Sequence, residues 1–262
     1  MQEGDPVADV SGRVSRGDSR FDVSGRNVWI VVPTYDEAEN VPVLIARLAD
    51  TLVGARVLVV DDASPDGTAT VARDAGADVL ERTGKLGLGA AYRAGFAEAL
   101  ARGARYVVQM DADLSHDPRY LPELLSAVVA GADAAIGSRY VPGGGCVDWP
   151  RLRRFLSRWG NRYAAGMLGL AVNDATSGYR VYSAEVLRRM NVDSVRAEGY
   201  GFQVEMTHRL VRVGGRVVEV PIVFRDRERG ESKLTYRIIG EAFRLVTRLA
   251  FRDLRRGQRR HL

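Results

Sequence analysis

The sequence predicts an α/β protein with a mostly parallel sheet flanked by helices, and two observations predict this class. Short runs rich in β-branched residues alternate with segments of helical periodicity between residues 28 and 136. The 262 residues are 46% hydrophobic, which is enough for a full core in one large domain. Because parallel strands are joined by crossover helices, this alternation indicates a sheet covered on both faces.

Each expected element rests on its local residue pattern. The β-branched runs predict strands at residues 28–32, 56–60, 78–81, 106–110 and 132–136. Apolar residues at helical spacing predict helices at 39–52, 68–75, 89–101 and 118–129. The pattern is looser after residue 137, with a glycine-rich loop at 142–145, a helix at 151–168 and a strand-helix-strand stretch that ends at 217–224.

Both ends of the chain differ in composition from its middle. Residues 1–26 are rich in Gly, Ser, Asp and Arg without an apolar run, which predicts a disordered leader and no signal peptide. Residues 27–235 are expected to form a single domain, and residues 236–262 a basic amphipathic helix and tail. No window reaches the roughly 18 to 20 apolar residues that a membrane-spanning helix needs. The single Cys146 excludes an internal disulfide and fits a reducing compartment.

The C-terminal helix is expected at 236–256 and concentrates the positive charge. Residues 244–262 carry seven arginines and one aspartate, a net charge of +6 in a chain whose total is +5. At about 100° per residue, the arginines fall on one side and the apolar residues on the other. The apolar side consists of Ile239, Val246, Leu249, Ala250 and Leu254. Two interpretations stay open: the helix lies on anionic lipid, or its apolar side packs on the domain.

Polar motifs directly follow the predicted strands, at residues 33–37, 61–65, 82–85 and 111–113. Ligands of such sheets bind beyond the carboxyl ends of the strands, so the motifs should converge on one rim. Asp111 and Asp113 can share a hard divalent cation, which in turn can neutralise a diphosphate. The pair therefore indicates nucleotide-sugar chemistry; its alternative, taken alone, is a helix cap or a solvated turn.

Two other phosphate-binding motifs are excluded. Gly87-Leu-Gly89 does not directly follow a strand, and Tyr92 stands where a dinucleotide fingerprint needs its third glycine. Gly84-Lys85 lacks the earlier glycine of a Walker loop, and Leu86 replaces its Ser or Thr. Dehydrogenase and kinase functions are therefore not indicated.

Seven segments, in order along the chain, carry a resemblance to a known family. They are residues 31–37, 59–67, 85–89, 110–116, 137–140, 174–180 and 229–233. With these segments the chain resembles the family-2 inverting glycosyltransferases, and within them the polyprenol (dolichol) phosphate mannose synthases. The resemblance implies a single GT-A (nucleotide-diphospho-sugar transferase) domain at 27–235. Processive synthases of the superfamily use Gln-x-x-Arg-Trp; here Phe155 precedes Arg158-Trp159, so processive synthesis is not expected.

The resemblance also implies a role for individual residues. Nucleotide-sugar binding is implied for Pro33, Tyr35, Glu37, Val60, Asp62, Lys85, Asp111, Ala112 and Asp113. Asp111, Asp113 and Ser115 are the implied ligands of Mg²⁺ or Mn²⁺, with Ser115 standing where close relatives carry Gln. Arg139, Arg153, Arg227 and Lys233 match the basic residues around the acceptor phosphate. The implied catalytic residues are Asp113, Arg139, Arg227 and Lys233.

The implied reaction moves mannose from GDP-mannose to a polyprenyl (dolichyl) monophosphate with inversion. Because a phosphate monoester has its second pKa near 6, no catalytic base is needed, and His116, His208 and His261 are expected to be structural. One alternative is a UDP-glucose-dependent glucosyltransferase. Another is a noncatalytic basic module that binds a membrane or nucleic acid.

The lipid acceptor implies contact with a membrane surface. The expectation is a peripheral protein on the cytoplasmic side of the plasma membrane, with a separate membrane-anchoring subunit as a further candidate partner. No nucleic-acid partner is expected of the transferase.

Overall fold

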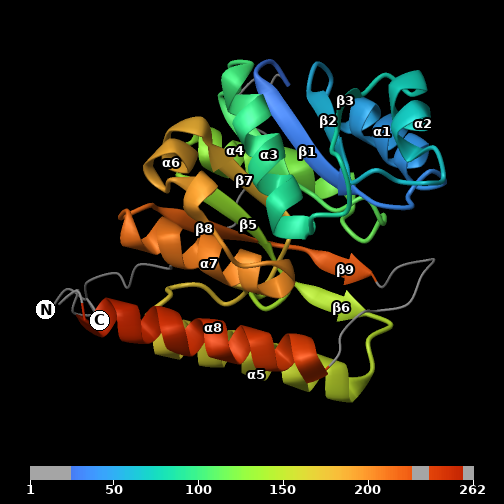
Figure 1. The fold of residues 1–262 in the computed structure, drawn as a ribbon. Coiled ribbons are helices and arrows are strands. Elements are labelled where there is room, and N and C mark those ends of the chain that lie inside the picture. The colour runs from blue at the N-terminus through green and yellow to red at the C-terminus, as the bar shows by residue number, and fades with distance from the viewer. Residues whose placement is uncertain (1–24, 226–235, 256–262) are drawn as a thin grey trace, which may run out of the picture.

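A seven-stranded sheet forms the centre of the molecule, with helices on both of its faces (Figure 1). The computed structural model describes residues 25–225 and 236–255. The strand order is β3-β2-β1-β4-β7-β5-β8. All neighbouring pairs are parallel except the two that β7 makes with β4 and β5. The prediction of a mostly parallel α/β fold is therefore confirmed.

The first half of the chain follows the predicted order closely. The strands are β1 Val28–Thr34, β2 Arg56–Asp61, β3 Asp78–Glu81, β4 Tyr106–Gln109 and β5 Ala134–Ser138. The helices are α1 Val41–Thr51, α2 Thr68–Asp74, α3 Leu88–Ala101 and α4 Leu121–Val129, with the 3-10 turn η1 Pro118–Tyr120 leading into α4. β5 begins two residues later than predicted. Residue 132 still belongs to the turn that ends α4, because its N–H donates to the Ala127 carbonyl.

The second half holds further strands and helices, among them the helices predicted at 151–168 and 236–256. They are β6 Gly145–Val147, α5 Arg151–Leu168, β7 Arg180–Ser183, α6 Ala184–Arg189, η2 Val192–Ser194, α7 Gly199–Arg212, β8 Val217–Pro221, β9 Val223–Arg225 and α8 Tyr236–Arg255. β6 and β9 pair in parallel as a separate two-stranded sheet. The direction of β7 and the β6–β9 pair were not foreseen, because both depend on contacts between segments far apart in sequence.

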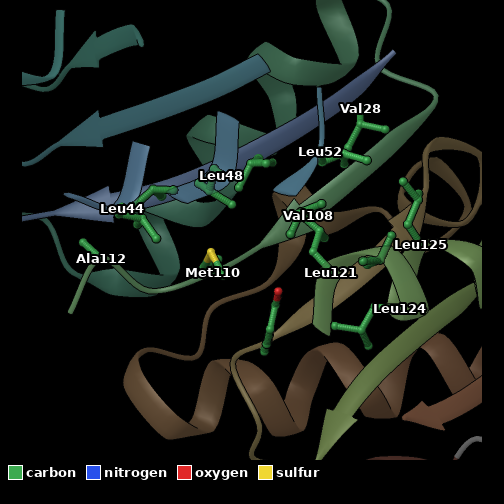
Figure 2. Packing of buried hydrophobic residues seen from close by; sticks show 14 of the residues in the cluster. Val28, Leu44, Leu48, Leu52, Val108, Met110, Ala112, Leu121, Leu124 and Leu125 are labelled. Carbon is green, nitrogen blue, oxygen red and sulfur yellow. The ribbon is translucent and has the colours of Figure 1, made fainter. Parts of the chain in front are cut away.

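Two apolar clusters bury the two faces of the main sheet. β1 alternates between them, with Ile30 in the first cluster and Val31 in the second. The first cluster packs Leu44 and Leu48 of α1 and Leu121 of α4 beneath the strands (Figure 2). Full burial of each such side chain stabilises the fold by about 1.5–3 kcal/mol relative to exposure. With both faces covered, ligands have access only beyond the strand ends.

A third apolar cluster fixes α8 against the domain. Val246, Leu249 and Ala250 of α8 pack with Ala164 and Leu168 of α5, so α8 lies beside α5 (Figure 1). Of the two interpretations left open by the sequence, the structure shows the one in which the apolar side of this helix packs on the domain. Leu254, expected on that side, is instead 69% exposed near the helix end. Within residues 25–225 and 236–255, no helix is long and apolar enough to span a membrane.

Candidate active site

The carboxyl ends of β1, β2 and β4 bring the predicted site residues to one rim of the sheet. Pro33 of β1 and Val60 of β2 are register partners across the parallel pair. One residue further on, Thr34 Oγ1 donates to Asp61 Oδ1 at 2.9 Å, and the Asp62 N–H donates to the Thr34 carbonyl at 3.1 Å. The loops that leave these strands therefore start from one hydrogen-bonded base.

Tyr35 and Lys85 lie in contact although 50 positions separate them. The Lys85 ammonium lies 3.4 Å from the centroid of the Tyr35 ring, a cation–π arrangement. The Tyr35 and Glu37 side chains are partly buried and Lys85 is exposed. Glu37 is held locally, because its Oε2 accepts a 2.7 Å hydrogen bond from Asn40 Nδ2.

Asp62 anchors the loop that carries Lys85. Its Oδ1 pairs with Arg82 Nη1 at 2.7 Å, and both side chains are almost fully buried. Its Oδ2 accepts from the N–H groups of Leu86 and Gly87 at 3.1 and 3.2 Å. One carboxylate thus fixes both ends of residues 82–87. Arg82 had no assigned role from sequence, because its partner lies 20 positions away.

The paired aspartates after β4 are each held by neighbours. Asp111 Oδ1 accepts a 2.7 Å hydrogen bond from the Tyr92 hydroxyl of α3. Asp113 Oδ1 accepts from Ser115 N at 3.1 Å and from Ser115 Oγ at 2.5 Å. Burial raises the pKa of Tyr92 well above its usual value, and the nearby Asp111 charge raises it further. Tyr92 therefore stays protonated and remains a hydrogen-bond donor.

His116, which was expected only to be structural, contacts the first of the paired aspartates. The backbone N–H of Asp111 donates to its Nδ1 at 3.2 Å, so the ring proton of the neutral imidazole resides on Nε2. The ring stacks on Tyr179 with 5.1 Å between centroids and meets the Phe224 ring edge-on at 5.7 Å. The position of His116 inside the 110–116 segment was the signal that could have identified it.

Gly178 brings the 174–180 segment against the paired aspartates. A Cβ at this position would lie 3.3 Å from Asp111 Oδ2 and 3.3 Å from His116 Cε1. The loop before β7 therefore packs directly on the Asp111 carboxylate. Only a residue without a side chain fits at this distance without a shift of its neighbours.

Arg139 forms a buried ion pair with Asp174. Its Nε donates to Oδ2 and its Nη2 to Oδ1, each at 2.7 Å, and its backbone N–H donates to Oδ2 at 3.0 Å. Burial alone would raise the pKa of Asp174, but the Arg139 guanidinium holds that pKa below its usual value. Arg139 Nη2 also donates to Thr176 Oγ1 at 2.8 Å. The charge of Arg139 is therefore largely offset within the protein.

Arg139 and Arg153, both predicted to contact the acceptor phosphate, approach the same indole ring. The guanidinium carbon of Arg153 lies 4.1 Å from the Trp149 centroid and that of Arg139 lies 5.4 Å from it. The Trp149 ring meets Phe224 edge-on at 5.6 Å, which connects this group to His116. The other two predicted residues of this set, Arg227 and Lys233, lie outside the described residues.

The oxygen atoms after β4 fit a hard divalent cation. Asp111, Asp113 and Ser115 offer carboxylate and hydroxyl oxygens only, the donor chemistry that Mg²⁺ and Mn²⁺ prefer. Ser115 donates its proton to Asp113, so the lone pairs of its hydroxyl remain for a cation. The described residues contain no group of three His, Cys, Asp or Glu placed to hold a metal alone. A phosphate-bearing ligand and water would therefore complete the coordination, as is usual for Mg²⁺.

Comparisons with known proteins indicate the family of this chain. Residues 29–190 match the family described as glycosyl transferase family 2. The undecaprenyl-phosphate mannosyltransferase of Micrococcus luteus is 51% identical over 226 residues, which cover 84% of this chain and 93% of that protein. The polyprenol monophosphomannose synthase of Mycolicibacterium smegmatis is 48% identical over 219 residues, which cover 81% of this chain and 83% of that protein.

Among solved structures, the chain resembles glucosyl-3-phosphoglycerate synthase from Mycobacterium tuberculosis. The complex of that protein with Mn²⁺, uridine-diphosphate-glucose and glycerol 3-phosphate superposes with a TM-score of 0.63 and 21% identity. The match covers 87% of this chain and 80% of that one. At this identity the likeness establishes a shared fold.

Proposed function

Because the chain belongs to glycosyl transferase family 2, we propose that it transfers mannose from GDP-mannose to a polyprenyl monophosphate with inversion at C1. The observation that carries the choice of acceptor and sugar is the pair of relatives at 51% and 48% identity, both named for mannosylation of a polyprenyl phosphate. The guanosine base of the donor is our inference from the seven motif segments. The boundaries 1–26, 27–235 and 236–262 for leader, catalytic domain and basic helix with tail remain part of the proposal.

The donor would bind across the rim of β1, β2 and β4. We assign Pro33, Tyr35, Glu37, Val60, Asp62, Lys85, Asp111, Ala112 and Asp113 to it. Two contacts support this assignment: the Lys85 ammonium already lies over the Tyr35 ring, and Asp62 fixes the loop that carries Lys85. Both contacts join residues far apart in the sequence, which supports a shared donor site at the rim.

Asp111, Asp113 and Ser115 would hold Mg²⁺ or Mn²⁺. A bound divalent cation supplies charge neutralisation to the departing diphosphate. The protein's own contribution is to fix the ligands, since Tyr92 orients Asp111 and Ser115 orients Asp113. These hydrogen bonds lower the reorganisation needed when the donor binds.

The acceptor phosphate would approach from the side of Trp149. An oxygen of the lipid phosphate attacks C1 of mannose, the bond between C1 and the diphosphate oxygen breaks, and GDP leaves with the bonding electrons. Because the acceptor is largely ionised at neutral pH, no side chain has to remove a proton. The role of the protein is to align the reacting groups and to reduce the repulsion between their charges.

The four basic residues are expected to contribute unequally to reducing the repulsion between the reacting charges. Arg139 is neutralised by Asp174, so we assign it to shaping the site as much as to binding phosphate. Arg153 lies beside it on Trp149 and is less buried than Arg139. Arg227 and Lys233 complete the proposed acceptor site and the proposed catalytic set with Asp113 and Arg139.

A comparison of donors tests the proposal. Purified protein with Mn²⁺ and a polyprenyl phosphate is given GDP-mannose or UDP-glucose at equal concentration, and the lipid product is identified by chromatography and mass spectrometry. We expect a mannolipid from GDP-mannose. Preference for the uridine donor would retain the enzyme class but reject the donor, favouring the UDP-glucose alternative.

A single variant separates the transferase from a noncatalytic basic module. Asp113→Ala should abolish transfer and leave the fold intact, because Asp113 lies outside the three apolar clusters. In a module that only binds a membrane or nucleic acid through residues after Arg244, the same change would have no effect. Absence of transfer from either donor by the wild-type protein would reject the transferase.

Our proposed location is the cytoplasmic face of the membrane, as a peripheral protein with or without a separate anchoring subunit.

A further inference from the structure

An apolar stripe is exposed along α5, the helix that follows Trp149. It consists of Leu152, Phe155, Leu156 and Trp159, which are 68%, 66%, 38% and 47% exposed. Their spacing of three, four and seven positions puts them on one face of the helix. Isolated exposed apolar residues are ordinary, whereas four on one helical face mark an interaction surface.

The opposite face of α5 accounts for how the helix is held. Asn161, Ala164 and Leu168 are buried, and Ala164 and Leu168 belong to the cluster shared with α7 and α8. Asn161 Nδ2 donates to Thr176 Oγ1 at 3.0 Å, which ties α5 to the segment beside the active site. The helix is therefore docked by this side. On the other side the Trp159 ring lies 5.3 Å from the Phe243 ring of α8, while Leu152 and Phe155 face outward.

The charge around the stripe selects the kind of partner. α5 contains five arginines, Arg151, Arg153, Arg154, Arg158 and Arg162, and no acidic residue. Four of the five are exposed. A face that combines Leu, Phe and Trp with arginines matches the boundary between anionic headgroups and acyl chains, where aromatic rings and long basic side chains are both favoured. An acidic protein surface would match the arginines but not four large apolar side chains.

The exposed stripe of α5 starts close to the proposed active site. Trp149 lies two residues before α5, and its ring meets that of Phe224. The Phe224 ring in turn meets His116, whose Nδ1 accepts from the Asp111 N–H. The stripe thus starts beside the proposed acceptor site. In Figure 1, β6 and β9 lie between the main sheet and the α5–α8 pair. A lipid held at a membrane against α5 would have a short path for its phosphate to the rim.

We propose that the exposed face of α5 is the surface with which this protein docks on an anionic lipid bilayer. The choice of a membrane as partner rests on the proposed function, because a polyprenyl phosphate resides in one. The main membrane contact is then α5 and not α8, whose apolar side packs on the domain. Leu152 and Phe155 enter the acyl boundary, Trp159 lies at the interface, and the arginines contact lipid phosphates.

Flotation of the purified full-length chain with vesicles tests the surface without donor or acceptor. Vesicles of phosphatidylcholine with or without phosphatidylglycerol serve as the probe. The double variant Leu152→Asn/Phe155→Asn should lower partitioning at least about tenfold, since two large apolar side chains are lost from the bilayer. Wild-type binding should require phosphatidylglycerol and weaken with salt. The matched control is Phe251→Asn/Leu254→Asn on α8, which replaces side chains of 61% and 69% exposure.

Tryptophan fluorescence gives a second measurement on the same samples. The chain has three tryptophans, and Trp29 and Trp149 are buried, so a blue shift on adding vesicles reports Trp159. We expect the shift in the wild type and in the α8 variant. We expect its loss in the α5 variant.

Several outcomes would overturn the inference. They are wild-type protein that does not float with anionic vesicles, an α5 variant that binds as tightly as wild type, and binding that is lost in the α8 variant instead. A wild-type dimer that the α5 variant converts to monomer, without any vesicle binding, would make this face a protein interface. The α5 variant should keep its activity toward a short, water-soluble isoprenyl phosphate, which shows that it is folded. If flotation behaves as expected but no mannose is transferred, only the proposed function fails.

Discussion

The Tyr92 hydroxyl donates a 2.7 Å hydrogen bond to Asp111 Oδ1, so a fully buried residue of α3 fixes the first of the two carboxylates after β4. The Tyr92 ring stacks on Phe202 of α7 with 5.6 Å between centroids. Packing therefore holds the ring in place while its hydroxyl orients the carboxylate. Tyr92 is a positioning residue that the sequence motifs do not include.

Removing this hydroxyl should weaken metal use more than stability. In Tyr92→Phe the ring stays packed but Asp111 loses its donor, so the Mn²⁺ concentration for half-maximal transfer should rise by about tenfold. Tyr163→Phe is the matched control, because its hydroxyl meets Thr247 between α5 and α8. An unchanged Mn²⁺ dependence in Tyr92→Phe would show that Asp111 needs no such support.

The buried pair of Arg139 and Asp174 should be the most costly ion pair to break. Asp174→Ala leaves a guanidinium buried without its carboxylate, and we expect the free energy of unfolding to fall by about 3–5 kcal/mol in urea titrations. Glu81→Ala removes the surface partner of Arg73 and should change the free energy of unfolding by no more than about 0.5 kcal/mol. Equal losses in the two variants would mean that burial does not set the energy of these pairs.

The contact of α3 with the sheet should tolerate no side chain at Gly95. A Cβ there would overlap Val31 Cγ1 and lie 2.9 Å from Val60 Cγ2, so Gly95→Ala should destabilise the fold by about 1–3 kcal/mol. At Gly166 of α5 a Cβ meets nothing within 4 Å. Gly166→Ala should therefore stabilise the protein by about 0.5–1 kcal/mol through helix propensity. Thermal unfolding of both variants measures the difference, and a stabilised Gly95→Ala would contradict the packing described for α3.

The contact between α7 and α8 should weaken in acid. Burial lowers the pKa of His208 below its usual value, an effect that Asp253 at 2.8 Å opposes and that Arg212 and Arg252 reinforce. As pH falls below about 6.5, the unfolded chain takes up this proton before the folded one does, so the free energy of unfolding decreases. His208→Gln lacks the titrating group, and its stability should fall less between about pH 7.5 and about pH 5.5. A fall as large as in wild type would assign the acid sensitivity to other groups.

Local pattern was enough to predict the first half of the fold and the convergence of its motifs. β1, β2 and β4 contain apolar runs, and residues placed just after parallel strands reach the same rim. The register of Pro33 with Val60 and the contact of Lys85 with Tyr35 agree with that rule. The antiparallel direction of β7 could not be predicted in this way, because its place between β4 and β5 is decided by packing across the whole sheet.

The hydrogen-bond partners of buried polar side chains could not be predicted from the sequence. Arg180 is fully buried in β7 and donates to the carbonyls of Ala175 and Ser177. An arginine in an Arg-rich chain gives no sign of such burial. The role of His116 was missed because only the fold shows that its Nδ1 accepts from the Asp111 N–H.

The role of the paired carboxylates can be measured directly as metal-dependent binding of GDP. Calorimetric titration of GDP with and without Mn²⁺ is compared in wild type, Asp113→Asn and the control Asp117→Asn. The Asp117 carboxylate accepts from the Arg119 N–H and pairs with the Arg119 side chain. Our account predicts that Mn²⁺ strengthens GDP binding in wild type and Asp117→Asn at least about tenfold and has no effect in Asp113→Asn. An Asp113→Asn protein that binds GDP as tightly, and with the same response to Mn²⁺, would contradict it.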